Sequence, residues 1–413
     1  MTRAGWTAAR WALGALACAA GAPLQAQEFG DATPLPRFAD EVRRWVEESP
    51  RDLLEDLKSD GVYLRAGSFA SGTGVAPGVD FWRPSIAGGA GFMASAARSL
   101  RGDTLVQARF GTLPGPARAL RLRSGQHSLE HLAPFRGRES GERPFFAYFE
   151  FTYRDLASSR LSSPATGTVR FGSEDSSYDA VVGYAFSERL AVSARAGRYT
   201  SRVTSLSPSP GLSADELRGA GVTGFGQRLD FARLGAELAF DTRDVPGDPR
   251  SGTFFALSWY RYDDQGSGTR HSFDRVSLDA RRFQPLGSER HVLALRLLGS
   301  RASASPDGVP VHMQEALGGS RSLRSYAGER FRGDEILSAS AEYRFGLAPW
   351  LELAAFYDLG GIWGGLADLE GPGWRSGWGL GARLKDDSGV LLRLDLARGR
   401  EGSQAHVSLG YSF

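Results

Sequence analysis

Residues 231–244 read FARLGAELAFDTRD, and apolar and polar side chains alternate along this stretch. The apolar face holds Ala232, Leu234, Ala236, Leu238 and Phe240. The positions between them hold Arg233, Gly235, Glu237, Ala239, Asp241 and Arg243. Successive side chains of a β-strand point to opposite faces, so this period of two predicts a strand with one apolar and one polar face.

The same alternation returns along most of the chain. Near the C-terminus, VLLRLDLA sets Val390, Leu392, Leu394 and Leu396 against Arg393 and Asp395, and HVSLGYSF (406–413) repeats the pattern with His406 and Ser408 on its polar face. We expect about sixteen such strands of roughly 9 to 13 residues, with the first near 62–70. The clearest are 88–99, 103–112, 144–155, 177–187, 190–202, 231–243, 252–263, 273–284, 291–302, 335–346, 350–362, 375–386, 389–398 and 404–413.

Two kinds of sheet protein alternate in this way, and strand length separates them. Strands of soluble sandwiches are usually about five or six residues long, roughly half the length seen here. The polar face is rich in Arg, Asp, Glu, Gly and Ser, and we assign an aromatic girdle to Trp259, Tyr260, Tyr262, Trp363 and Trp374. An apolar band around a polar interior predicts an all-β fold, a transmembrane antiparallel β-barrel of the bacterial outer membrane, over residues 61–413.

The first 26 residues have the pattern of a secretory signal peptide. Arg3 and Arg10 precede a short apolar run, and small residues lead to Ala26, after which we expect cleavage. The run is shorter than the roughly 20 residues that a membrane-spanning helix needs. The single cysteine, Cys18, lies within this signal, so we expect no disulfide in the mature chain, and Ala15 disfavours a lipid anchor at Cys18.

Residues 27–60 differ from the rest of the chain. Apolar residues from Phe38 to Val46 fall on one helical face, and Ser49-Pro50 is typical of the start of a second helix. We therefore predict a periplasmic helical segment at 27–60, with two short amphipathic helices within 37–58. Their polar face is acidic, which favours packing on protein over binding to a membrane surface.

Charge and motifs exclude several classes of function. A formal net charge of +2 on 413 residues gives no indication of nucleic-acid binding, and the segment after the signal has no apolar run of about 18 residues. The G-x-G-x-x-G at 219–224 has no βαβ context for a nucleotide. His127–His131 spells H-x-x-E-H, but a zinc site there would need a third ligand and a helix, whereas 113–143 has the composition of a loop. We predict no catalytic residue, metal or cofactor.

Seven segments of the C-terminal part, spread over some 170 positions, carry a resemblance to a known family. They are DTRDVPGDPRSGTFF (241–255), LGGSRSLRSYAGERFRG (317–333), SAEYRF (340–345), FYDLGGIW (356–363), GLGARL (379–384), VLLRLDLA (390–397) and the terminal SLGYSF (408–413). In these residues and in their order, the C-terminal part resembles the bacterial surface antigen superfamily of outer-membrane barrels, the BamA/TamA-like group.

The resemblance implies that a long loop folds into the barrel lumen, where the arginine of an R-G-[FY] tip pairs with acidic residues of the wall. Here the tip reads Leu323-Arg324-Ser325-Tyr326, with serine in place of the family's glycine. Glu342 and Asp358 both belong to the polar faces of their strands and should point into the lumen. We therefore predict a lumenal loop lock formed by Arg324, Tyr326, Glu342 and Asp358, since one guanidinium can bridge two carboxylates.

The alternative is that the arginines of this segment, Arg321, Arg324, Arg330 and Arg332, belong to an extracellular loop that is solvated or bound to lipopolysaccharide. The resemblance further assigns Tyr411 and Phe413 to the C-terminal barrel signal. Outer-membrane lipids and lipopolysaccharide are the expected partners, together with client outer-membrane proteins or a periplasmic partner.

The resemblance implies a role in insertion, assembly or translocation of proteins at the outer membrane. Such a role would require the first strand, near 62–70, and the last, 404–413, to pair poorly and open sideways. Residues 27–60 are too few for a periplasmic client-capture domain, which would need about 60 residues or more. A passive pore or structural barrel is therefore the alternative, and a hydrolase that uses His127 is the third hypothesis.

Overall fold

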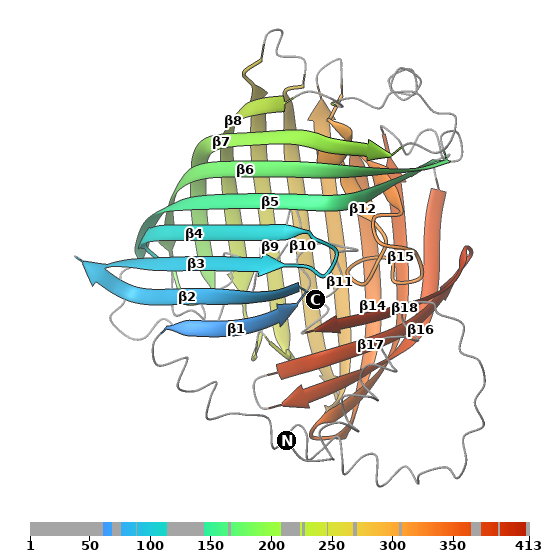
Figure 1. Ribbon diagram of the computed structural model, residues 1–413. Coiled ribbons are helices and arrows are strands. Elements are labelled where there is room, and N and C mark those ends of the chain that lie inside the picture. Colours follow the sequence, from blue (N-terminus) through green and yellow to red (C-terminus); the bar gives the residue numbers. More distant parts are fainter. Residues whose placement is uncertain are drawn as a thin grey trace, which may run out of the picture.

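The computed structural model describes residues 61–67, 76–87, 89–113, 144–163, 167–207, 224, 228–245, 247–266, 271–304, 308–364, 373–386 and 389–409. Sixteen strands form one antiparallel sheet in which each strand pairs with the next along the chain (Figure 1). They are β1 (Val62–Gly67), β2 (Ala76–Ala87), β3 (Ala90–Arg98), β4 (Thr104–Thr112), β5 (Phe145–Ser163), β6 (Gly167–Ala185), β7 (Leu190–Ser207), β8 (Arg228–Asp241), β9 (Gly252–Asp264), β10 (Phe273–Leu286), β11 (Ser288–Ala304), β14 (Glu335–Ala348), β15 (Leu351–Trp363), β16 (Gly373–Asp386), β17 (Gly389–Gly399) and β18 (Gly402–Leu409).

The sheet curls round so that its two edge strands, β1 and β18, come close together. A few of their Cα atoms lie within 8 Å of each other, yet the described residues show no ladder that joins the two strands. Over the described residues, the wall therefore has the shape of a barrel with one seam, between β1 and β18, at which backbone pairing is interrupted. The predicted all-β, sixteen-stranded antiparallel fold is confirmed.

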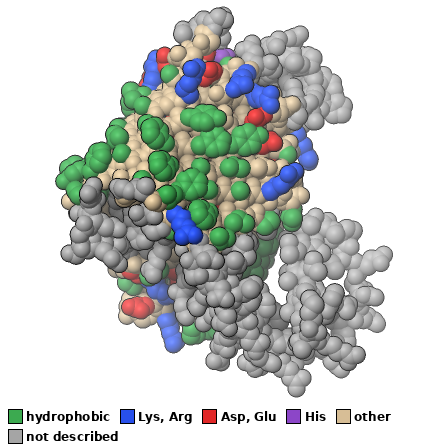
Figure 2. All heavy atoms as spheres, turned by 60° about the vertical axis from the view of Figure 1, so that its left-hand side comes forward, with side chains coloured by type: hydrophobic (Ala, Val, Ile, Leu, Met, Phe, Trp, Pro, Cys, Tyr) green, Lys and Arg blue, Asp and Glu red, His purple; other side chains and the backbone are tan. Residues whose placement is uncertain are grey.

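The predicted alternation in β8 matches the two faces of the wall. Phe231, Glu237 and Asp241 are buried on the inner face, whereas Leu234 is 51% exposed on the outer face. Hydrophobic side chains spread across the outer face in Figure 2, and charged side chains gather mainly toward its upper edge. Since the inner face is rich in charged groups, the lumen is held together by ion pairs as well as by apolar contacts.

Strand lengths differ from the prediction where the outer face becomes polar. β5, β6 and β7 contain 19, 19 and 18 residues, and β6 begins at Gly167 rather than at 177. The extra residues of β6, GTVRFGSEDS, include few apolar side chains and show no apolar face. Val390 is a second difference, because a register shift between Leu384 and Lys385 changes the parity of β17 and buries this residue.

The aromatic girdle needs a correction. Tyr260 and Tyr262 belong to the inner face of β9, because they lie at even-numbered positions, whereas Trp259 lies at an outward position and is 38% exposed. Tyr262 is buried in a lumenal cluster with Tyr199, Phe231 and Phe273, and Tyr260 packs against that cluster. Aromatic composition near a strand end does not indicate a face by itself, whereas strand parity does.

Several predictions fall outside the described residues. These are the signal peptide, the helical segment at 27–60, His127–His131, Tyr411 and Phe413, and of the motif at 219–224 the structure describes only Gly224. Across the described ranges, no helix has the length and apolar character needed to cross a membrane.

Candidate functional site in the lumenal loop

The connection between β11 and β14 contains the candidate site. Its described part, 308–334, begins with the short helix η3 (Val311–Met313) and continues through β12 (Glu315–Leu317), which pairs with β13 (Phe331–Gly333). Between these two strands lies the segment 318–330, here named the loop tip. Gly318 has a φ of 117°, and a Cβ there would lie 2.2 Å from the Ala327 carbonyl oxygen, so the turn requires glycine.

Apolar side chains seat the loop tip against the wall. Leu323 and Tyr326 of the tip are 0% and 1% exposed, and they pack with Leu317 and Phe331 of the hairpin. Ile336 and Ile362 of the wall complete the cluster. Burial of each such side chain stabilises the seated loop by roughly 1.5 to 3 kcal/mol, so the tip is a packed element of the lumen.

Arg324 connects the loop tip to two neighbouring strands. Its Nε and Nη2 donate to the two oxygens of Asp358 on β15 at 2.9 and 2.8 Å, and its backbone N–H donates to Asp358 Oδ2 at 3.0 Å. Its Nη1 donates to Glu342 Oε2 on β14 at 2.5 Å. The structure therefore brings Arg324, Glu342 and Asp358 into one buried cluster, with the guanidinium between the two carboxylates.

Further arginines of the wall contact Glu342 and the neighbouring carboxylate of Asp395. Arg344 Nε and Arg383 Nη2 donate to the oxygens of Glu342 at 2.7 and 2.8 Å. Arg393 lies 3.0 Å from Asp395, which also lies 3.4 Å from Arg383. All these groups are at most 2% exposed, so each charge depends on its neighbours for solvation.

The ring of Phe356 lies under the Arg324 guanidinium, with 3.4 Å between Cζ and the ring centroid. A cation in this position is attracted by the face of the ring. Burial lowers the pKa of Arg324, but the Asp358 and Glu342 carboxylates outweigh burial and raise the pKa above its ordinary value. The guanidinium therefore remains charged at every pH at which the barrel is folded.

The loop tip is hydrogen-bonded to four further strands: three donate to backbone carbonyl groups of the tip, and the fourth accepts a bond from it. Arg296 on β11 donates to Arg321 O at 2.9 Å, Arg393 on β17 donates to Ser320 O at 2.7 Å, and His406 on β18 donates to Arg324 O at 2.7 Å. The Tyr326 hydroxyl donates to Ser376 O on β16 at 3.4 Å. With Glu342 on β14 and Asp358 on β15, the tip joins six strands, including the edge strand β18.

Glycines of the wall provide the surface on which the loop tip rests. Gly377 on β16 faces Gly399 on β17 across the ladder, and Ser325, which is 1% exposed, lies against both. A Cβ at Gly377 would lie 1.9 Å from Ser325 Oγ, and one at Gly399 would lie 2.8 Å from the same atom. The serine of the tip therefore fits because the wall has no side chains beneath it.

This close approach predicts the effect of Gly377→Ala. The added methyl group would collide with Ser325 and displace the tip, with an expected loss of about 1 to 3 kcal/mol of unfolding free energy. Ser325→Gly removes the two atoms nearest the new Cβ and should restore part of this loss in the double variant. Equilibrium unfolding of the four variants measures the coupling, and additive losses would show that the two residues do not interact.

His312 in η3 is expected to make the stability of the folded loop depend on pH in the acidic range. Burial lowers the pKa of His312 to about 4; Asp175 partly opposes this effect, and Arg332, Arg154 and His271 strengthen it. The unfolded chain binds this proton near pH 6.5. Stability is therefore expected to fall as pH falls from about 6.5 to 4, at most about 1.4 kcal/mol per pKa unit. Protease sensitivity of the loop against pH should show this loss in the parent chain and a flatter profile in His312→Gln.

Sequence reasoning missed several of these residues. Arg344 and Arg383 lie on the polar faces of SAEYRF and GLGARL, so the parity that indicated Glu342 could also have indicated them. Strand parity did not indicate that Gly377, Gly399 and the ring of Phe356 would contact the loop. Their role depends on strand register and on the depth to which the loop enters the lumen.

The cluster is suited to holding a loop in place. Within the part of the chain that the structure describes, no group of three or more His, Cys, Asp or Glu side chains is placed to hold a metal ion. The Glu342 and Asp358 carboxylates of the wall lie against guanidinium groups, and the one of Arg324 fixes the loop to the wall.

The wall has a fold similar to that of solved outer-membrane structures. Among solved structures, BamA from Haemophilus ducreyi lacking POTRA domains 1–3 has a similar fold, with a TM-score of 0.60 and 13% identity over 91% of this chain and 82% of that chain. CdiB from Acinetobacter baumannii gives 0.48 at 13% identity over 85% and 59%, and CdiB from Escherichia coli gives 0.48 at 12% over 84% and 62%.

No curated protein matches the sequence. Residues 153–413 match the Omp85 superfamily domain, well over half of the chain, and they include the loop, its ion-pair cluster and the strands that carry it. The predicted resemblance to BamA/TamA-like barrels is thus confirmed, and the chain belongs to the Omp85 superfamily.

Proposed function

We propose that this barrel assists the insertion of client β-barrel proteins into the bacterial outer membrane, with translocation of a client as the related activity. The observation that carries the proposal is the seam between β1 and β18, where the described residues have no strand ladder. An edge strand in lipid leaves N–H and C=O groups without partners, at a cost of several kcal/mol for each group. A client strand that pairs with such an edge would satisfy them.

Pairing of this kind is β-augmentation, in which an extended segment adds to a free sheet edge through main-chain hydrogen bonds. It selects clients by their ability to form strands, which suits a protein that handles many barrels. β1 contains six residues, so it would provide a short starting template from which a client could later separate.

The loop tip supports this proposal by holding the opposite side of the seam. It joins β11 and β14 to β18, so these strands would move as one body while β1 opens. We assign to Arg324, Glu342, Asp358 and Tyr326 the role of a lumenal loop lock. A tip that lies inside the lumen and contacts six strands also disfavours a wide passive pore.

The test uses the purified protein in liposomes and follows a urea-unfolded client barrel as it becomes resistant to protease. The proposal predicts that folding is faster than in protein-free liposomes and in liposomes that contain an unrelated closed barrel at the same density. Equal rates in all three samples, together with large steady conductance of the protein alone, would instead support the passive pore.

A further inference from the structure

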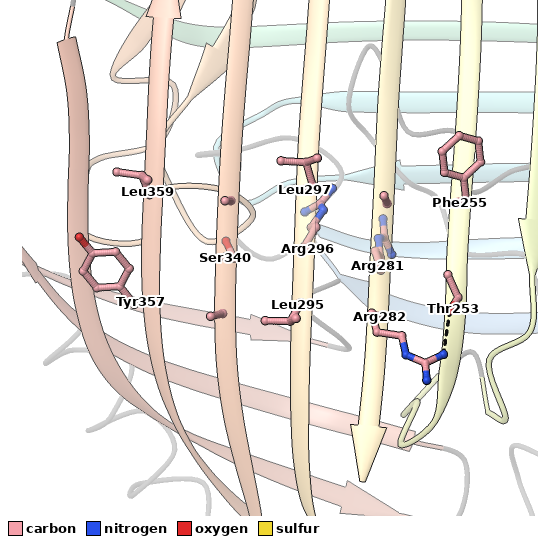
Figure 3. Close-up of a pocket in the computed structure, with 13 residues that line it drawn as sticks. Thr253, Phe255, Arg281, Arg282, Leu295, Arg296, Leu297, Ser340, Tyr357 and Leu359 are labelled. Atoms are coloured by element: carbon pink, nitrogen blue, oxygen red, sulfur yellow. Dashed lines mark hydrogen bonds between the residues drawn. The ribbon is translucent and has the colours of Figure 1, made fainter. Parts of the chain in front are cut away.

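A depression of about 470 Å³ lies on the outer surface of the wall over β9, β10, β11, β14 and β15 (Figure 3). Its size falls within the range of about 300 to 1,000 Å³ that is typical of ligand sites. The depression lies on the membrane-facing side, away from the loop lock, and the insertion mechanism proposed above does not use it.

Cross-strand neighbours of unequal size form the depression. One row across five strands reads Phe255, Ala280, Leu297, Ala339 and Leu359, and the row beside it reads Thr253, Arg282, Leu295, Ala341 and Tyr357. Directly opposed residues have Cβ atoms about 4.5 to 5.5 Å apart, so each small side chain leaves a gap between larger ones. The leucines of β11 form a ridge. On one side, Ala339 and Ala341 of β14 form a furrow two residues long, and on the other side Ala280 of β10 forms a furrow one residue long that ends at Arg282.

Arg282 lies at one end of the depression on an outward position of β10 (Figure 3). Its Nη1 donates to Thr253 Oγ1 at 3.0 Å, and its Nη2 donates to Gln284 Oε1 at 2.8 Å. Both acceptors are neutral, and no carboxylate of the described ranges forms an ion pair with Arg282. A positive charge on the lipid face costs up to about 2 to 4 kcal/mol at the bilayer centre and less near the interface, so an anionic partner would be favoured.

The turns indicate which leaflet supplies that partner. Outer-membrane barrels have short periplasmic turns and longer extracellular loops. β10 and β11 are joined by the single residue Gly287 close to Arg282, whereas the long connection at 305–334 lies at the opposite end of β11. Arg282 therefore belongs to the periplasmic half of the wall, where the lipids are glycerophospholipids.

We propose that this depression binds an anionic glycerophospholipid of the periplasmic leaflet, with Arg282 on its phosphate and its acyl chains in the furrows on either side of the Leu295 and Leu297 ridge. One cation and one apolar furrow on each side of the ridge match one phosphate and two acyl chains. The guanidinium fork suits a phosphate because it can donate two parallel bonds. The bound lipid would neutralise the charge and fill the gaps above the alanines.

Native mass spectrometry of the detergent-purified protein, titrated with phosphatidylglycerol and with phosphatidylcholine, tests the site. We expect one phosphatidylglycerol molecule to bind more tightly than phosphatidylcholine. Arg282→Gln should weaken phosphatidylglycerol binding by about tenfold and abolish the preference. Ala339→Phe fills a furrow on the outer surface and should weaken both lipids.

The matched control is Arg261→Gln. Arg261 is also an outward arginine, on β9, but it pairs with Asp274 at 2.7 Å, so its loss should not change lipid binding. Each variant must show the heat-modifiable migration of the folded parent. Equal binding of the two lipids to the parent, an unchanged affinity in Arg282→Gln, or a preference for lipid A over phosphatidylglycerol would overturn the proposal.

Discussion

Arg324→Ala is expected to lower the unfolding free energy of the barrel by about 3 to 5 kcal/mol, the cost of breaking a buried ion pair from one side. The variant leaves Asp358, which is 0% exposed, without the guanidinium that donates to both of its oxygens. Glu342 keeps Arg344 and Arg383, so most of the loss should come from Asp358. Equilibrium unfolding in detergent, followed by heat-modifiable migration, measures the effect.

Arg301→Ala is the control for this prediction. Arg301 pairs with Glu335 at 2.9 Å, but its side chain is 76% exposed, and exposed pairs contribute about 0 to 1 kcal/mol. Asp358→Asn removes the charge that Arg324→Ala leaves behind, so the double variant should lose less than the sum of the single variants. A loss in Arg324→Ala no larger than in Arg301→Ala would show that the lock does not stabilise the barrel.

Closing the seam covalently is expected to stop client insertion almost completely. In a Cys18→Ala background no other cysteine is present, so a pair of cysteines, one in β1 and one in β18, can form a single new disulfide across the seam. If the client pairs with the free edge, the oxidised protein should fold clients no faster than protein-free liposomes. Reduction should restore the rate, because the substitutions themselves leave the backbone edge available.

A disulfide elsewhere in the wall controls for the chemistry. The hydroxyl oxygens of Ser277 and Ser300 lie 2.9 Å apart on the paired strands β10 and β11, so cysteines at these two positions join strands that are already bonded. This pair should leave insertion unchanged in both redox states. Full activity of the oxidised seam pair would mean that clients do not pass through the seam.

The architecture of the wall could be predicted from the sequence because apolar and polar side chains alternate in every strand that has one apolar face. Leu234 faces outward and Glu237 inward as the alternation required, and the polar positions in the SAEYRF strand point inward. Prediction failed where the face signal was lost. The polar start of β6 and the bulge that buries Val390 depend on pairing with a neighbouring strand, which a single strand does not encode. The inward position of Tyr262 follows from the parity of β9, which the assignment to an aromatic girdle did not apply.

The candidate site likewise contains residues that could be predicted from the sequence and residues that could not. The parity of their strands placed Glu342 and Asp358 in the lumen, and the family resemblance pointed to Arg324. The contacts of Ser325 with Gly377 and Gly399, and those of His406 and Arg393 with the tip carbonyl groups, could not be predicted. They bring together residues more than 50 positions apart, and their distances follow from how deeply the loop enters the lumen.

Disulfide capture of a client during folding tests directly whether clients pair with β1. A single cysteine is placed in turn at each position of β1, with Leu257→Cys on the outer face of β9 as the control, since Leu257 is 40% exposed but belongs to a paired strand. The client carries one cysteine in its last strand and is stopped midway by low temperature. If clients pair with β1, cross-links should alternate along β1 and be absent at position 257. Cross-links of equal yield at β1 and at position 257, or none in β1 while the client folds at the full rate, would contradict this pairing.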